Sequence, residues 1–82
     1  MDMTKEEIFN TVKTITVDEL DVDENRVTMD ARIKDDLDAD SLDVFEIMNE
    51  LEDKFEIELG ADEGIETISD VVDFVKKQLD EK

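Results

Sequence analysis

The chain has no cysteine and no histidine among its 82 residues. Without cysteine there is no disulfide framework, no thiolate zinc site and no thiol nucleophile. Without histidine the commonest general base and the commonest transition-metal ligand are missing, which excludes serine-hydrolase and cysteine-protease arrangements in their usual form. We therefore expect no catalysis by this chain alone.

Proline is also absent, glycine occurs only twice, and no apolar run approaches the length of a membrane span. The first residues, Met1 to Glu7, do not have the pattern of a signal peptide. We expect a cytoplasmic protein that folds as one domain over residues 1–82, because a chain of this size rarely divides into two cores.

Positive charge is scarce: nine Lys and Arg face 27 Asp and Glu, a net charge of −18. This charge argues against binding to nucleic acid or anionic lipid. It favours a basic protein partner, a cation or plain solubility, and its self-repulsion favours a monomer. Leu, Ile, Val and Phe still supply 25 of the 82 residues, above the level of roughly 20% that is typical of disordered chains. The composition therefore predicts a compact fold.

Three segments have the apolar spacing of amphipathic helices. The first covers about residues 5–17 and begins at a capping box formed by Thr4 and Glu7. The second runs from near Ser41 to about Phe55. For the last helix we expect Ser69 to be the N-cap. Its apolar stripe then contains Val72, Val75 and Leu79, with Ile68 and Val71 alongside.

The connections between these helices differ in length and composition. Residues 18–40 have no glycine or proline, and we expect a packed or functional loop anchored by Leu20, Val22, Val27, Ile33 and Leu37. Residues 55–59 alternate briefly, which fits either a continued helix or an extended exit. Asp62 and Glu63 indicate one short helical turn that carries Ile65 inward. The sequence thus predicts an all-α, small four-helix bundle, with three longer helices, one short one and a long loop between helices one and two.

The second helix has two unlike faces at 100° per residue. Its core face carries Val44, Met48, Leu51 and Phe55, with Ile47 at the edge, and the water face carries Asp43, Glu46, Glu50 and Asp53. Leu42, Phe45 and Asn49 fall outside the core face, next to the acids. Two interpretations stay open for Leu42 and Phe45: they pack under the preceding loop, or they are apolar anchors of an acidic protein-docking face.

Ser41 would occupy the first position of this helix, with Asp40 as N-cap and Asp43 three residues on. Free amides and the helix dipole favour an anion attached there. From position alone, ordinary helix-start chemistry explains this serine more simply.

Calcium binding by an EF-hand is the competing interpretation of Asp36, Asp38 and Asp40. That loop needs Gly at its sixth position and Glu at its twelfth, which here are Ser41 and Ile47. The motif fails. Loose binding of divalent ions by Asp30, Asp35, Asp36 and Asp38 stays open beside the simpler alternative of solvated charge.

One stretch resembles a known family. Asp40-Ser41-Leu42-Asp43, followed by Glu46, Leu51-Glu52-Asp53 and Phe55, closely resembles the motif of acyl carrier proteins, specifically the discrete bacterial-type carriers of fatty-acid synthase. The similarity extends over nearly the whole chain in length, acidity, the long first loop and Ile68-Ser69-Asp70-Val71.

The resemblance implies that Ser41 bears 4′-phosphopantetheine, which a separate phosphopantetheinyl transferase transfers from coenzyme A. The thiol of that arm would carry acyl groups as thioesters, so the chain would be a carrier and no enzyme, serving fatty-acid synthesis enzymes with basic docking patches. The family's partner-contacting positions match Asp40, Leu42, Asp43, Phe45, Glu46, Asn49, Glu52 and Asp53. Its acyl pocket implies Val44, Met48, Leu51, Ile65, Ile68 and Val72.

Two residues depart from the family pattern. Phe45 is bulkier than the small aliphatic residue often found there, and Asn49 replaces a common apolar residue. Two further hypotheses stay open: a carrier for a specialised acyl, polyketide or aminoacyl pathway, and an acidic protein-interaction module without prosthetic group.

Overall fold

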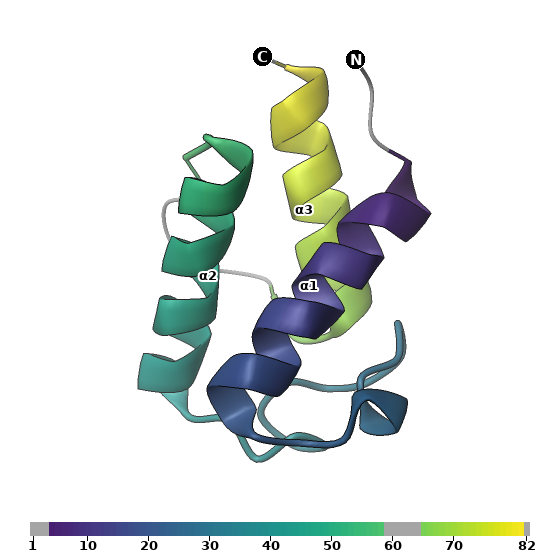
Figure 1. Cartoon of the computed structure of the whole chain (residues 1–82), viewed down its shortest axis with the longest axis vertical. Helices are drawn as coiled ribbons and strands as arrows, with labels where there is room; N and C mark the ends of the chain where they lie inside the picture. The colour runs from purple at the N-terminus through teal and green to yellow at the C-terminus, as the bar shows by residue number, and fades with distance from the viewer. Residues whose placement is uncertain (1–3, 59–64, 82) are drawn as a thin grey trace.

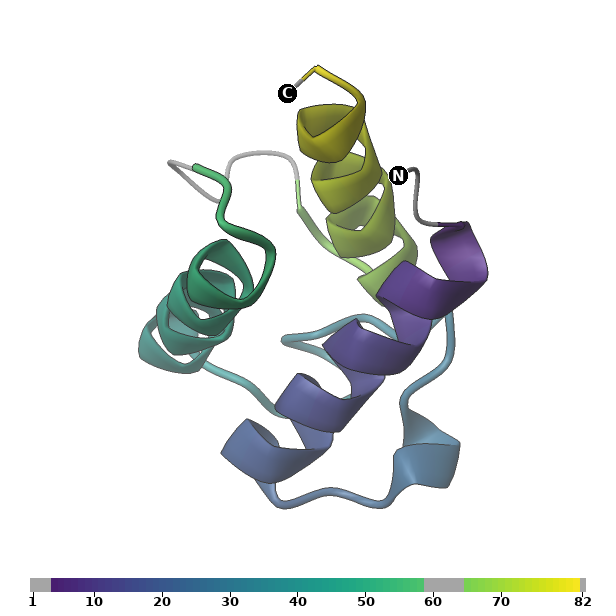
Figure 2. The ribbon, with the colours of Figure 1, turned by 45° about the horizontal axis from the view of Figure 1, so that its top comes forward.

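The computed structural model describes residues 4–58 and 65–81, which form three α-helices and one 3-10 turn. In chain order these are α1 (Lys5–Leu20), η1 (Glu24–Arg26), α2 (Ser41–Phe55) and α3 (Ile68–Asp80). Helix α1 packs against both α2 and α3 (Figure 1), and the tilted view of Figure 2 shows the long loop folded beneath the three. The predicted all-α class and the long loop are confirmed, whereas the short fourth helix predicted at Asp62 and Glu63 lies outside the described residues.

Helix α1 begins as predicted. The Glu7 amide donates to Thr4 Oγ1 at 3.2 Å, and the Thr4 amide donates to Glu7 Oε1 at 3.0 Å. The predicted end at Val17 is wrong, because the helix continues to Leu20, which packs against the core. It stops at Asp21, where φ is 55° and the amide donates to the Val17 carbonyl at 2.9 Å.

The long loop is packed, as predicted. Val27, Ile33 and Leu37 are buried, and Leu20 and Val22 are partly buried against the same core. The short turn η1 within the loop was not predicted.

Thr67 is the N-cap of α3, so the prediction of Ser69 as N-cap is wrong. Thr67 Oγ1 accepts from the Asp70 amide at 3.2 Å, and Asp70 Oδ2 accepts from the Thr67 amide at 3.1 Å. This box needs an acid three residues after the cap, which Thr67 has and Ser69 has not. The Ser69 amide donates instead to the Met29 carbonyl at 3.0 Å, so the loop caps α3.

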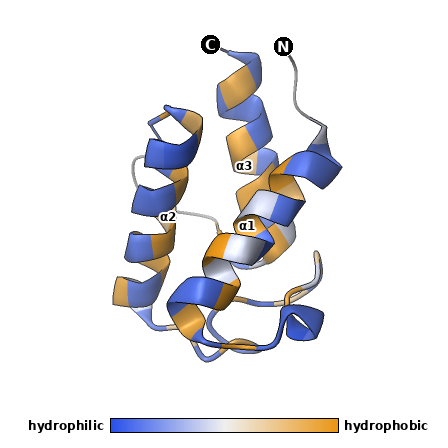
Figure 3. Cartoon of the chain, viewed as in Figure 1, coloured by the Kyte–Doolittle hydropathy of each residue, from blue (hydrophilic) through white to orange (hydrophobic). Residues whose placement is uncertain are grey.

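Apolar and hydrophilic positions alternate along the helices in Figure 3, and the buried apolar residues form one core with the loop. Helix α2 ends at Phe55, and Glu56 follows with a φ of 55°, so the alternative of a continued helix is wrong. Ile57 is buried beyond the helix end. Within the described ranges, no helix is both long and apolar enough to cross a membrane.

Candidate functional site

The start of α2 is built from its own sequence. Asp40 is the N-cap, as predicted: its Oδ1 accepts from the Asp43 amide at 2.9 Å, and Asp43 Oδ2 accepts from the Asp40 amide at 3.3 Å. Ser41 is the first residue of the helix and is exposed. The capping therefore fixes the main chain on both sides of an accessible hydroxyl.

The segment before Ser41 is also held in place. The Ala39 amide donates to the Ile33 carbonyl at 3.1 Å, and both residues are buried. Arg26 Nη2 donates to the Asp36 carbonyl at 2.6 Å, while Asp36 Oδ2 accepts from the Arg32 amide at 2.8 Å. These hydrogen bonds fix the end of the loop that leads into Ser41.

Two large apolar side chains lie open to solvent beside this hydroxyl. Leu42 is 63% exposed and Phe45 is 57% exposed, so the alternative that they pack under the loop is wrong. Carboxylates surround them along the same helix. Of the other positions predicted to contact partners, four are exposed and two are partly exposed: Asp40, Glu46, Asn49 and Asp53, then Asp43 and Glu52.

The opposite face of α2 is the core face that its periodicity predicts. Val44, Met48 and Leu51 are all buried. They share one cluster with Ile68 and Val72, and Ile65 is partly buried against it. The residues that the resemblance assigns to an acyl pocket are thus brought together in the structure.

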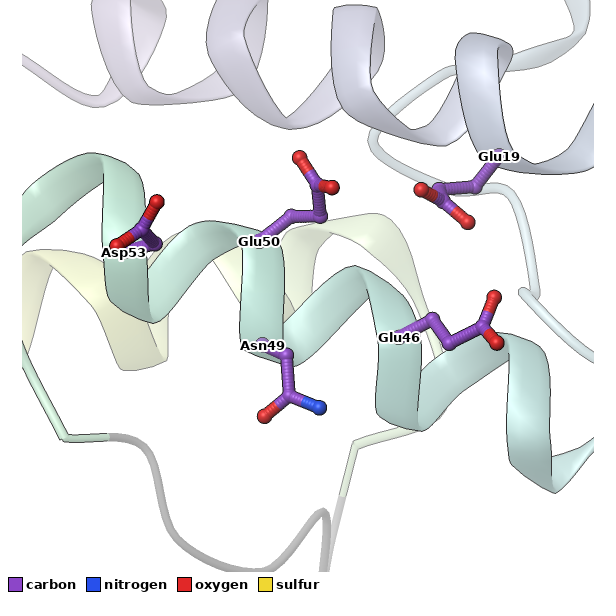
Figure 4. A pocket seen from close by; sticks show the side chains of 5 residues that line it. All are labelled: Glu19, Glu46, Asn49, Glu50 and Asp53. Atoms are coloured by element: carbon purple, nitrogen blue, oxygen red, sulfur yellow. The ribbon is translucent and has the colours of Figure 1, made fainter.

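An acidic groove lies between α1 and α2. Glu19 of α1 faces Glu46 and Glu50 of α2, with Asn49 and Asp53 completing the lining (Figure 4). Desolvation, a hydrogen bond with Glu46 and then the charges of Glu46, Glu50 and Asp18 raise the pKa of Glu19. Sequence reasoning missed Glu19 because it ended the helix at Val17. The signal that would have found it is Leu20, three residues further along the same apolar face.

Two of the four loop carboxylates considered for divalent ions, Asp35 and Asp36, have other contacts. Asp35 pairs with Arg32 at 3.6 Å, and Asp36 accepts the Arg32 amide as described above. Within residues 4–58 and 65–81, no three Asp or Glu residues are arranged to hold a metal ion.

With this geometry in view, comparison with known proteins decides the family. The family model described as "Phosphopantetheine attachment site" matches residues 10–75. The chain is 41% identical to the acyl carrier protein of Borrelia garinii subsp. bavariensis over 93% of this chain and 98% of that protein. It is 42% identical to the one from Exiguobacterium sibiricum over 94% of this chain and 100% of that protein.

The chain belongs to the acyl carrier proteins. The solved structure of the acyl carrier protein from Enterococcus faecalis agrees, with a TM-score of 0.75 and 40% identity over 93% of this chain and 99% of that one. Membership confirms the predicted function, an acyl carrier of fatty-acid synthesis with a phosphopantetheine attachment site. Acyl carrier proteins are non-catalytic carriers, so the prediction of a carrier and no enzyme is confirmed as well.

Proposed function

We propose that Ser41 Oγ bears the 4′-phosphopantetheine of this acyl carrier protein. The observation that carries the proposal is the exposed hydroxyl at the first residue of α2, held by the Asp40 and Asp43 cap. A phosphoester there lies at the positive end of the helix dipole. When bound, the group supplies a thiol that this cysteine-free chain lacks and that carries acyl groups as thioesters.

The chain offers one alternative serine for comparison. Ser41 and Ser69 are its two serines, and both lie within the matched residues 10–75. Ser69 is the second residue of α3, is only partly exposed, and lies where the loop pairs with that helix through the Met29 carbonyl. Ser41 is exposed and is therefore the more accessible of the two serines.

The docking face supports transient partners. Leu42 and Phe45 supply the apolar contacts, and the carboxylates around them complement Arg and Lys of a basic patch. Complementary charge of this kind sets encounter rate and specificity more than affinity, which suits a carrier that must release its cargo. The proposed partners are a phosphopantetheinyl transferase and fatty-acid synthesis enzymes with basic docking patches. The proposed face consists of Asp40, Leu42, Asp43, Phe45, Glu46, Asn49, Glu52 and Asp53.

The buried face of α2 supports the proposal that the acyl chain is held among the helices. An alkyl chain that enters between the helices would replace contacts among Val44, Met48 and Leu51 with contacts to itself, at little cost in exposed apolar area. The proposed lining also includes Ile65, Ile68 and Val72. A monomer acting in the cytoplasm, as the composition predicts, is part of this proposal.

The test is the intact mass of the protein after incubation with coenzyme A, magnesium and a phosphopantetheinyl transferase. Wild type and Ser69→Ala should gain one phosphopantetheine, and Ser41→Ala should gain none. A full adduct on Ser41→Ala, or none on wild type with a transferase that loads a control carrier, would overturn the proposal.

A further inference from the structure

Thr16 of α1 has a buried hydroxyl that nothing in the described chain binds. The residue is 0% exposed, and its Oγ1 has no hydrogen-bond partner among residues 4–58 and 65–81. It continues the buried row of Ile8 and Val12, which are likewise 0% exposed. Buried hydroxyls are nearly always hydrogen-bonded, so an unpaired one needs a specific reason.

Two other threonines of α1 donate hydrogen bonds to main-chain carbonyls of their own helix, and Thr16 does not. Thr11 Oγ1 donates to the Glu7 carbonyl at 3.3 Å, and Thr14 Oγ1 donates to the Asn10 carbonyl at 2.9 Å. The same spacing would let Thr16 donate to the Val12 carbonyl, but it does not. Its hydroxyl is therefore left unused by its own helix, with its donor free for a group inside the bundle.

Contacts between α1 and α2 on either side of Thr16 show which turn of α2 lies at the same height as its hydroxyl. Glu19 of α1 contacts Glu46 of α2, and Ile15 lines a groove with Glu50. Thr16 lies between Ile15 and Glu19 in sequence, so it is level with the turn from Glu46 to Glu50. At 1.5 Å per residue, that turn is about 8–13 Å along the helix from Ser41.

On the inner side of this turn α2 carries only apolar residues. Ile47 is 2% exposed and Met48 is 4% exposed. Met48 belongs to the proposed acyl lining. The unpaired donor of Thr16 and the side chain of Met48 thus both belong to the buried interior that an acyl chain from Ser41 would enter.

We propose that Thr16 Oγ1 donates a hydrogen bond to the 3-oxo oxygen of a bound acyl chain, and that this carrier thereby retains 3-oxoacyl chains better than saturated ones. The proposal rests on the attachment at Ser41. A saturated chain has no acceptor beyond its carbon-1 carbonyl and would leave the hydroxyl unpaired in an apolar site, whereas the oxygen at carbon 3 would satisfy it.

The test compares two cargoes on one carrier. A phosphopantetheinyl transferase loads the apo-protein from coenzyme A analogues that carry octanoyl or 3-oxooctanoyl groups, joined by an amide that does not hydrolyse. The Tm of each loaded form is then measured. In wild type, 3-oxooctanoyl should raise the Tm by several degrees more than octanoyl does. Thr16→Val keeps the shape and removes the hydroxyl, so the difference should vanish, while Tm without cargo should rise.

Two variants and one spectroscopic signal keep the test decisive. Thr16→Ser keeps the hydroxyl and should keep the preference, as should Thr14→Val, which removes an exposed hydroxyl from the same helix. With a ¹³C label at carbon 3 of the chain, the carbonyl resonance should shift between wild type and Thr16→Val but not between wild type and Thr14→Val.

The outcomes separate this inference from the proposed function. Absence of an adduct on wild type would refute the attachment at Ser41 itself. Complete loading with the same difference between cargoes in wild type and Thr16→Val would overturn only the role of Thr16, as expected if a buried water satisfies the hydroxyl. An equal loss for both cargoes in Thr16→Val would overturn the preference for 3-oxo chains.

Discussion

The Asp43 amide donates to Asp40 Oδ1 at 2.9 Å and the Asp40 amide donates to Asp43 Oδ2 at 3.3 Å, so each aspartate caps the main chain of the other. Ser41 lies between these two residues in the sequence, at the first position of α2. Two of the free amides at the start of α2 are thereby satisfied, and the serine is held in one backbone geometry.

Replacing Asp40 by alanine should reduce the free energy of unfolding by about 1 kcal/mol, because the α2 cap is lost. Asp40→Asn keeps an acceptor oxygen and should retain most of the stability. Urea unfolding of the apo-protein followed by circular dichroism measures both. Equal losses for the two variants would show that the charge of Asp40, rather than its capping bond, supports the helix.

Phe45→Ala should separate docking from stability. Since Phe45 is 57% exposed, its truncation should change the free energy of unfolding by less than about 0.5 kcal/mol. It should lower kcat/KM for the phosphopantetheinyl transferase by about tenfold, as loss of an apolar anchor does. Met48→Ala is the matched control on the buried face, with an expected stability loss of about 2–5 kcal/mol. A kcat/KM unchanged in Phe45→Ala would remove this residue from the docking face.

Asp38 has a φ of 58°, three residues before Ser41. Glycine adopts this left-handed conformation without the steric cost of a Cβ atom, and that cost exceeds the entropy that glycine loses on folding. Asp38→Gly should therefore raise the free energy of unfolding by about 0.5–1 kcal/mol. Asp23→Gly is the matched control, because Asp23 has a φ of −65° and no capping bond. It should lower stability, and a similar gain in both variants would contradict the strain at Asp38.

The carboxylate of Asp70 should make stability depend on acid pH. The Glu66 amide donates to Asp70 Oδ2 at 2.9 Å and the Thr67 amide donates to the same atom at 3.1 Å, which lowers the pKa of Asp70. Because the folded pKa is below the unfolded value of about 3.9, this stabilisation is present above that pH and is lost as the pH falls through the folded pKa.

Asp70→Asn should therefore be less stable than wild type at pH 7, by about 1 kcal/mol, because neutral acceptors bind amides more weakly than carboxylates. The difference in stability between the two proteins should close as the pH falls through the folded pKa of Asp70, because wild type is then protonated too. Urea unfolding across this range measures it. If the difference in stability between Asp70→Asn and wild type persisted unchanged at low pH, the shape of the side chain rather than its charge would explain it.

The carboxylate of Glu19 should make stability depend on pH in the direction opposite to Asp70. Its raised pKa means that the folded state binds the proton more tightly than the unfolded state does. The associated stability is present below the unfolded pKa of about 4.3 and is lost as the pH rises through the folded pKa. Glu19→Gln should therefore raise the Tm at pH 7, and added NaCl should reduce that gain by screening Glu46 and Glu50.

Glu6→Gln makes the same charge change in the first turn of α1, where a carboxylate suits the helix dipole. It should not raise the Tm. If both variants raised it equally, net charge alone would explain the result, and the pairing of Glu19 with Glu46 would have no separate role.

Local sequence patterns predicted the parts of the fold that local chemistry determines. Apolar spacing placed Val44, Met48 and Leu51 in the core, and the acid three residues after Asp40 predicted the α2 cap. The same argument applied to α3 would have chosen Thr67, whose partner Asp70 is also three residues on. Serine favours helix starts, which points to Ser69, but a hydroxyl without a partner acid is the weaker signal.

Other features depended on neighbours far away in the sequence. A helical wheel leaves the exposure of Leu42 and Phe45 open, because it does not show where the loop passes. The loop passes instead beneath α3, where the Met29 and Ala31 carbonyls accept from its first amides. Long-range pairing of this kind decided which apolar residues stay on the surface.

The most direct test of the central claim is tandem mass spectrometry of peptides from the loaded protein, which locates the phosphopantetheine on the chain. The account predicts the whole adduct on Ser41 and none on Ser69. An adduct on Ser69, or on any residue away from the start of α2, would contradict it.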